Sequence, residues 1–187
     1  MVNYLKQYRV PFTGLSIGKH DFEFTIDKAF FDCYEYSIVK DGTLKAAVSL
    51  QKQENMMVLK FHITGTIALT CDVCLSAFPS KTDIEERLIV KFMDEDMVES
   101  TEEILVLAKH EHELDLANLL YEYINVSVPY YARCNKQGEN ISCDSAVVAK
   151  LNELAPEQGD GEKEEEKKEE QTDPRWDALK NIKYNKN

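Results

Sequence analysis

The sequence is poor in glycine and lacks any long apolar run. Only seven glycines occur in 187 residues, which leaves little scope for the glycine-rich loops that cradle phosphate groups. No stretch approaches the roughly 20 apolar residues that cross a bilayer, and the N-terminus carries no secretory signal pattern. We therefore expect a soluble, cytoplasmic protein that makes no contact with a membrane.

Catalytic motifs are also missing. There is no Gly-x-x-x-x-Gly-Lys loop, no Gly-x-Ser-x-Gly elbow and no His-Glu-x-x-His helix. The many carboxylates are dispersed along the chain, which is typical of a solvated surface rather than of an acid–base pair. These absences favour a protein that is not an enzyme. An enzyme of unrecognised type is the less favoured alternative.

Positive charge is scarce outside the C-terminal end. Of the net charge of −12, residues 1–155 contribute −9, residues 156–172 contribute −5 and residues 173–187 contribute +2. Affinity for nucleic acids rests largely on Lys and Arg residues that displace counterions. We therefore expect no DNA binding, and we expect any contact with RNA to be indirect, through a protein or ribonucleoprotein partner.

Alternating apolar residues predict several β-strands. The alternation covers residues 21–26, 44–50, 57–63 and 84–92, and each of these segments fits a strand with one buried face. Asp41-Gly42 is typical of a hairpin turn, and residues 104–107 are expected to add a short strand. Sequential strands with short turns favour an antiparallel meander, which can curl into a barrel-like sheet.

Helices are predicted mainly in the second half of the chain. Asp27 is a suitable N-cap for a short helical turn. A helical stripe follows Asp115 and ends near Asn125; its apolar residues are Leu116, Leu119, Leu120 and Tyr123. Ser142 or Asp144 is expected to cap a further helix, whose predicted buried face consists of Val147, Val148, Leu151 and Leu154. The predicted fold class is α+β, an antiparallel meander with two or three helices.

Composition divides the chain into three parts: a domain over residues 1–155, a linker over 156–172 and a tail over 173–187. The linker has no large apolar residue, so we expect it to be disordered. Asp173 and Pro174 are a suitable N-cap and first position for a short C-terminal helix. A helix of about ten residues is marginal in water, which predicts that this one docks on a partner or on the domain itself. The residues expected to bind the partner are Asp173, Pro174, Arg175, Trp176, Leu179, Lys180 and Lys183.

The spacing of the cysteines indicates a candidate zinc site. Cys71 and Cys74 have the spacing of a zinc knuckle, and Cys134 and Cys143 are the candidates for the other two ligands of a tetrahedral ion. His110 and His112 are possible substitutes for them. In a second interpretation the cysteines are small apolar residues of the core, which is also the simplest explanation of Cys33. A redox function for Cys71 and Cys74 is less favoured, because strands rather than a helix N-terminus flank the pair.

Taken in order, several motifs resemble the YceD family. They are Cys71-x-x-Cys74-Leu75 after the meander, Val128-Pro129 after the predicted helix, Cys143, and Asp173-Pro174-Arg175 followed by Leu179 and Lys183. The family consists of small bacterial proteins, with plastid relatives, that are associated with accumulation of large-subunit ribosomal RNA. Val73 stands where many members carry arginine, and Cys134 and Cys143 lie further apart than the compact cysteine group of many members.

The resemblance implies a non-enzymatic factor in ribosome biogenesis. Such a factor would support accumulation or processing of large-subunit ribosomal RNA through a protein or ribonucleoprotein partner, and the family implies no reaction to assign to these residues. The alternative is a zinc-stabilised protein-interaction module with no link to ribosomes.

Overall fold

The computed structural model describes residues 4–93, 104–108, 110–139 and 141–155. The chain separates into two units, Met1–Glu153 and Leu154–Asn187. The sheets, the core and the cysteine site described below all belong to the first unit. The predicted linker and the predicted docking residues Asp173 to Lys183 lie outside the described residues.

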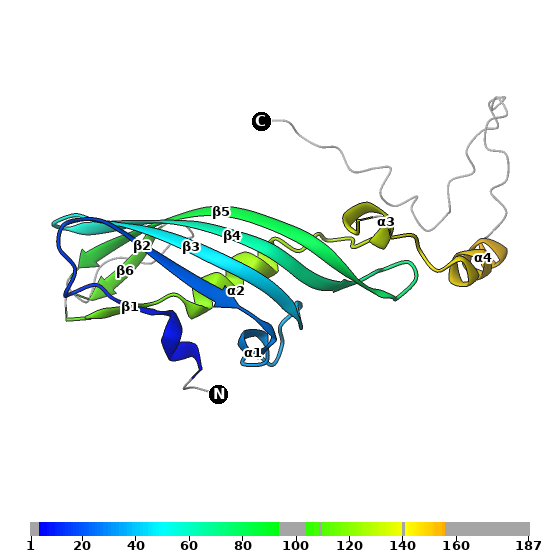
Figure 1. Ribbon diagram of the computed structural model, residues 1–187, viewed down its shortest axis with the longest axis horizontal. Coiled ribbons are helices and arrows are strands. Elements are labelled where there is room, and N and C mark those ends of the chain that lie inside the picture. Colours follow the sequence, from blue (N-terminus) through cyan, green and yellow to red (C-terminus); the bar gives the residue numbers. More distant parts are fainter. Residues whose placement is uncertain (1–3, 94–103, 109, 140, 156–187) are drawn as a thin grey trace, which may run out of the picture. The chain divides into compact units, whose positions relative to one another are not determined.

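Two β-sheets organise the first unit (Figure 1). The larger has five strands in the order β2-β3-β4-β5-β6, and the smaller pairs β1 with β7. The strands are β1 (Arg9–Pro11), β2 (Gly18–Ile26), β3 (Gly42–Lys52), β4 (Met56–Thr70), β5 (Ala77–Met93), β6 (Ile104–Ala108) and β7 (Glu113–Asp115). Neighbouring strands from β2 to β5 are antiparallel, whereas β5 and β6 are parallel.

Short helices complete the unit. They are the 3-10 helix η1 (Leu5–Tyr8) and the α-helices α1 (Lys28–Phe31), α2 (Ala117–Val126), α3 (Cys134–Gln137) and α4 (Ser145–Leu154). The predicted cap of α1 is confirmed, because the Asp27 side chain accepts a hydrogen bond from Phe30 N. Helix α2 lies across one face of the large sheet (Figure 1), where the ring of Tyr123 packs edge-on against Phe61 of β4.

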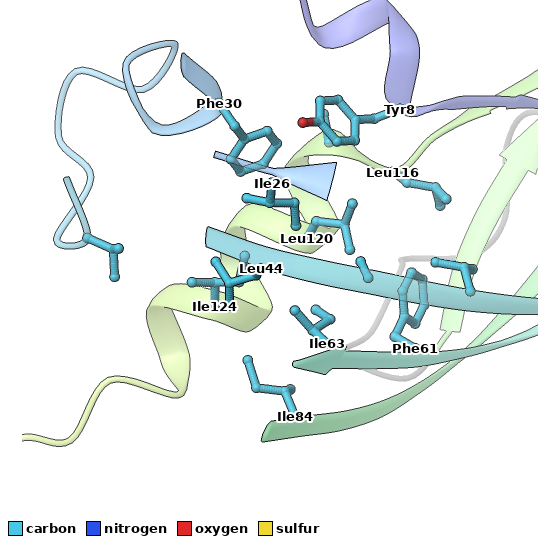
Figure 2. Close-up of a cluster of buried hydrophobic side chains, with 14 of the residues drawn as sticks. Tyr8, Ile26, Phe30, Leu44, Phe61, Ile63, Ile84, Leu116, Leu120 and Ile124 are labelled. Carbon is cyan, nitrogen blue, oxygen red and sulfur yellow. The ribbon is translucent and has the colours of Figure 1, made fainter. Parts of the chain in front are cut away.

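The core lies between the large sheet and α2 (Figure 2). Alternate residues of β3 face inward and are almost fully buried: Leu44, Ala46, Val48 and Leu50. From the other side, Leu116, Leu120 and Ile124 are completely buried, whereas Leu119 and Tyr123 of the predicted stripe are partly buried. Near one edge, the Tyr8 and Phe30 rings pack edge-on with their centroids 5.0 Å apart.

The predicted α+β class is confirmed, but the sheet does not close into a barrel. Within the described part of the chain, β2 and β6 are the two edges of the large sheet and do not pair with each other. The predicted strand near residues 104–107 is present as β6. It pairs with β5 in parallel rather than continuing the antiparallel meander.

The hairpin turn predicted at Asp41-Gly42 is wrong. Gly42 is the first residue of β3, where it pairs with Ile67, and Asp41 lies at the end of a longer connection that includes α1. The Asp41 carboxylate accepts a hydrogen bond from Gly42 N, which is typical of Asp in turns and loop ends alike. The dipeptide therefore marks the start of a strand and not a two-residue loop.

The buried face predicted for the last helix is wrong for its C-terminal half. Helix α4 forms where expected, and the Asp144 side chain caps it by accepting from Ala146 N. However, no residue of α4 is fully buried: Val147 and Val148 are half-buried, with Val147 packed against the core, whereas Leu151 and Leu154 are exposed. Within the described residues, no helix is long and apolar enough to span a membrane.

Candidate metal centre

Three separate segments bring four cysteine side chains together. Cys71 and Cys74 lie in the turn between β4 and β5, Cys134 is the first residue of α3, and Cys143 lies between α3 and α4. The sulfur atoms of all four lie within 4.8 Å of one another. Cys71, Cys74 and Cys134 are buried, and Cys143 is partly buried.

The turn that holds Cys71 and Cys74 is closed by backbone hydrogen bonds. Leu75 N donates to Cys71 O at 2.9 Å, and Cys71 N donates to Ser76 O at 2.9 Å. This closure places Leu75 at a φ of 60°, in the left-handed region that few residues other than glycine adopt. The tight turn points both thiols of the pair to the same side, as a knuckle for one metal ion requires.

A second set of contacts fixes the chain segment that supplies Cys134. Asp72 N donates to Ala132 O at 2.8 Å, and Ala132 N donates to the Asp72 carboxylate at 2.7 Å. Gly138 N donates to Cys134 O at 3.0 Å and ends α3. A side chain at Gly138 would collide with Cys134 O and press on Phe78. The knuckle and the segment carrying Cys134 therefore hold each other in place.

The distances between the sulfur atoms match those of a tetrahedral thiolate site. Cys71 Sγ lies 3.9 Å from Cys143 Sγ, and Cys74 Sγ lies 3.8 Å from Cys134 Sγ. Cys134 Sγ and Cys143 Sγ are 3.3 Å apart. Four sulfurs at about 2.3 Å from a tetrahedral zinc ion lie about 3.8 Å from one another. An ion at the centre would therefore require only small side-chain adjustments.

The protein environment lowers the pKa of two of the four thiols and raises the pKa of the other two. Cys134 N donates to Cys71 Sγ at 3.5 Å, and this bond, helped by the N–H groups of Cys74 and Val73, lowers the pKa of Cys71 to about 6. The N–H groups of Asp144 and Ser76 lower the pKa of Cys74. Backbone N–H groups thus stabilise negative charge on the knuckle sulfurs, as a cation ligand requires.

The pKa values of the other two thiols, Cys134 and Cys143, are raised. Burial raises the pKa of Cys134 to about 12, and the neighbouring sulfurs act in the same direction. A bond with the Cys134 thiol lowers the pKa of Cys143, but burial and the sulfurs of Cys71 and Cys74 outweigh it, so that the pKa rises. A divalent cation would displace the protons of these two thiols, which couples metal binding to proton release.

The donor set fits zinc, and the coordination shell would be closed. Four thiolates are a common ligand set of structural zinc sites, whereas catalytic zinc keeps one position open for water or substrate. Soft sulfur donors also disfavour magnesium and calcium, which take oxygen ligands. The residues could thus hold a metal ion that joins three segments of the chain.

The structure brings together the four cysteines that the sequence singled out as ligands, despite the wide spacing of Cys134 and Cys143. His110 and His112, considered as substitutes, are not part of the cluster. Cys33 lies elsewhere and donates its thiol to Ala29 O at 3.3 Å. Sequence reasoning did not identify the contribution of Asp72, because its two bonds to Ala132 join residues far apart in the chain.

The fold and the site together define an α+β protein with a four-cysteine candidate metal centre. Comparison with protein families matches residues 59–183 to the model of the large ribosomal RNA subunit accumulation protein YceD. The match covers the knuckle, α2, both later cysteines and the predicted docking residues, so the chain belongs to the YceD family. The resemblance inferred from the sequence motifs is thus confirmed. No curated protein and no solved structure matches the chain.

Proposed function

We propose that this protein is a non-enzymatic factor in ribosome biogenesis that acts through protein or ribonucleoprotein contacts. The observation that carries the proposal is the family match over residues 59–183, since the family is described by accumulation of large-subunit ribosomal RNA. In this role the protein supports accumulation or processing of that RNA, and it reaches the RNA through a partner because residues 1–155 carry a net charge of −9.

The cysteine cluster is proposed to bind zinc as a structural element, with Cys71, Cys74, Cys134 and Cys143 as ligands. Its support is the mutual distance of the sulfurs and the N–H groups that favour thiolate at Cys71 and Cys74. A shell of four thiolates leaves no position for a substrate. The metal would hold residues 128–145 against the knuckle and thereby shape the surface that a partner meets.

The C-terminal tail is proposed to supply a second contact. Its basis is the sequence, in which Trp176, Leu179 and Ile182 share one side of a predicted helix and Arg175, Lys180 and Lys183 add positive charge. The acidic residues 156–172 would act as a tether. The contact residues are Asp173, Pro174, Arg175, Trp176, Leu179, Lys180 and Lys183.

Deletion of the gene tests the role itself. Sucrose-gradient profiles and quantification of 5′ and 3′ precursor ends should show reduced large-subunit RNA, which the full-length gene restores. A gene truncated after Ala155 should restore less than the full-length gene does. Unchanged precursor and mature RNA in the deletion strain would refute the ribosomal role and leave an interaction module without a link to ribosomes.

Elemental analysis tests the metal. Protein purified without chelator should contain close to one equivalent of zinc, and Cys134→Ser should retain little of it. Cys33→Ser is the matched control, because its thiol lies outside the cluster. Equal zinc content in the two variants would show that the ion binds elsewhere, and negligible zinc in the unmodified protein would remove the site.

A further inference from the structure

A groove opens beside the candidate metal centre. It has a volume of about 690 Å³ and is formed by the loop before β3, the end of β4 and the segment after α2. Much of its lining is apolar and includes Ile38, Leu69, Val128 and Tyr130. Ile38 is 68% exposed and the Tyr130 side chain is fully exposed. Apolar side chains gathered around a groove are typical of a surface that binds another molecule.

The charged side chains of the groove are two carboxylates and one lysine, which give it a net charge of −1. Asp41 and Asp72 belong to its lining, and each accepts a hydrogen bond from a backbone N–H. Neither carboxylate forms an ion pair within the described part of the chain. The lining contains one basic residue, Lys40, whose Nζ donates a hydrogen bond to Glu35 O at 3.1 Å.

The C-terminal end of α2 adds to this negative character. Asn125 in the last turn of α2 and Val128 just beyond it both line the groove. The carbonyl groups at the end of a helix carry partial negative charge and favour a nearby cation. Helix α2 has no basic residue in its last turn. Asn125 Nδ2 donates to Tyr121 O and Ser127 Oγ donates to Ile124 O, so the end of this helix is capped by neutral groups and carries no cation of its own.

We propose that the groove binds an extended, basic peptide segment of a partner protein. Apolar side chains of the segment would contact Ile38, Val128 and Tyr130, and its lysines or arginines would face Asp41 and the end of α2. Charge complementarity decides the choice of partner, because RNA phosphates would meet the same carboxylates and carbonyl groups with repulsion. The inference deepens the proposed function, on which it rests for its biological setting, by naming basic protein segments as the partner class.

Fluorescence anisotropy with defined probes tests the groove in the full-length protein. The main probe is a labelled nine-residue peptide that alternates leucine and lysine. The comparison probes are the same peptide with glutamate in place of lysine and a labelled nine-nucleotide poly(U) RNA. We expect saturable binding of the basic peptide, and binding at least ten times weaker for the other two probes.

Matched variants separate the groove from general acidity. Ile38→Ser should weaken binding of the basic peptide at least fivefold, whereas Ile17→Ser should leave it unchanged, although Ile17 is similarly exposed at 64%. Asp41→Asn should weaken binding at low salt, with Glu85→Gln as the control on the outward face of β5. Any attraction by the acidic residues 156–172 is the same in all four variants. If Ile38→Ser lowers the melting temperature, Tyr130→Ser replaces it, because that side chain is fully exposed.

Four outcomes would overturn the inference. They are the lack of saturable binding, equal losses in Ile38→Ser and Ile17→Ser, poly(U) binding as tight as that of the basic peptide, and self-association of the protein that Ile38→Ser abolishes. Each of them leaves the ribosomal role untouched, because that role is judged from RNA in the deletion strain. Conversely, normal RNA in that strain together with selective peptide binding would refute the role and retain the groove.

Discussion

Leu75 occupies a backbone conformation that usually belongs to glycine, directly after the second cysteine of the knuckle. Its φ is 60° and its side chain is 76% exposed, so packing of the side chain offsets little of the backbone strain energy. The left-handed conformation costs a residue with a Cβ atom about 1–2 kcal/mol. Leu75 is therefore a position at which the knuckle turn carries backbone strain.

Substitutions of Leu75 should separate backbone strain from packing of the side chain. Leu75→Gly should be as stable as the unmodified protein or more stable by up to about 1 kcal/mol, because relief of strain exceeds the entropy gained by the unfolded chain. Leu75→Val should be less stable by about 1 kcal/mol, because β-branched residues fit this region poorly. Thermal denaturation measures both. A marked loss of stability in Leu75→Gly would contradict the argument and indicate intramolecular packing.

Acid should release the metal through the knuckle sulfurs. The pKa of Cys71 is lowered to about 6, so this group stays a thiolate above that pH and is protonated as pH falls through it. Binding must also displace the protons of Cys134 and Cys143, so we expect zinc retention against a chelating indicator to fall as pH drops below about 8, and to fall more steeply below about pH 6, where Cys71 is protonated as well. Retention that does not change down to about pH 4.5 would show that protonation of Cys71 does not limit binding.

Strand β4 is the element on which the rest of the sheet is built. It pairs with β3 from Met57 to Ile67 and with β5 from Met56 to Thr70 without interruption, and it ends one residue before Cys71. Gly65 lies within it at a φ of 153° and directly against the backbone of Thr43 and Leu44. A glycine in the middle of a strand usually weakens it, but here it permits close approach of β3.

Gly65→Ala should destabilise the protein by more than about 2 kcal/mol, because a Cβ atom would collide with Thr43 O while the backbone is held at a positive φ. Gly18→Ala measures the cost of the positive φ alone, because φ at Gly18 is 140° but nothing lies within 4 Å of the added Cβ atom. Gly14→Ala, with open space and no positive φ, should change stability by less than about 0.5 kcal/mol. Urea denaturation of the three variants gives the comparison, and similar losses in all three would contradict it.

The alternation of apolar residues was sufficient to predict most of the strands and the burial of their inner faces. The pattern is local, and burial of alternate residues such as Leu44 and Ala46 follows from it directly. The prediction of a hairpin turn at Asp41-Gly42 was wrong because this dipeptide suits both a hairpin turn and the end of a longer loop. The parallel pairing of β6 depends on the path of the preceding connection, which no local pattern records.

The sequence indicated which cysteines form the candidate site but not how the fold arranges them. Cysteine spacing identified Cys71 and Cys74 as a pair, whereas Cys134 and Cys143 join them only because residues far apart in the chain meet in the fold. The apolar spacing of α4 predicted a buried face, of which only Val147 and Val148 are half-buried while Leu151 and Leu154 are exposed. The pattern shows which side of a helix is apolar but not how much of that side another element covers.

At the scale of the whole molecule, the cysteine cluster joins the large sheet to the chain that follows α2. The sheet and α2 share a core that includes Phe61, Leu120 and Ile124 (Figure 2), and Cys71, Cys74 and Cys134 belong to the same cluster of buried residues. Among its described residues, the segment from Val128 to Cys143 has one regular element, α3, a helix of four residues. Its position is held by the cysteine cluster, by the bonds between Asp72 and Ala132 and by an ion pair between Lys81 and Glu139.

Removal of zinc should loosen that segment selectively. Hydrogen exchange measured by mass spectrometry, with and without a zinc chelator, should show faster exchange over residues 128–145 and little change over β3 and β4. The physical reason is that local opening costs less than unfolding of the shared core. Cys33→Ser should behave as the unmodified protein does. Uniform loss of protection over the sheet would show that the metal supports the entire domain.

The separation of the ligands along the chain has a consequence for biosynthesis. Cys74 and Cys134 are 60 residues apart, and chains are made from the N-terminus at about 5–20 residues per second. The hairpin of β4 and β5 is therefore complete for several seconds while half of the ligand set is still unmade. During that interval Cys71 and Cys74 are a pair of ligands without the other two, so their thiols can be oxidised or can bind a wrong metal. If the cluster binds zinc as proposed, one ion can contact all four sulfurs only after Cys143 has left the ribosome, so completion of the site must follow synthesis of that residue.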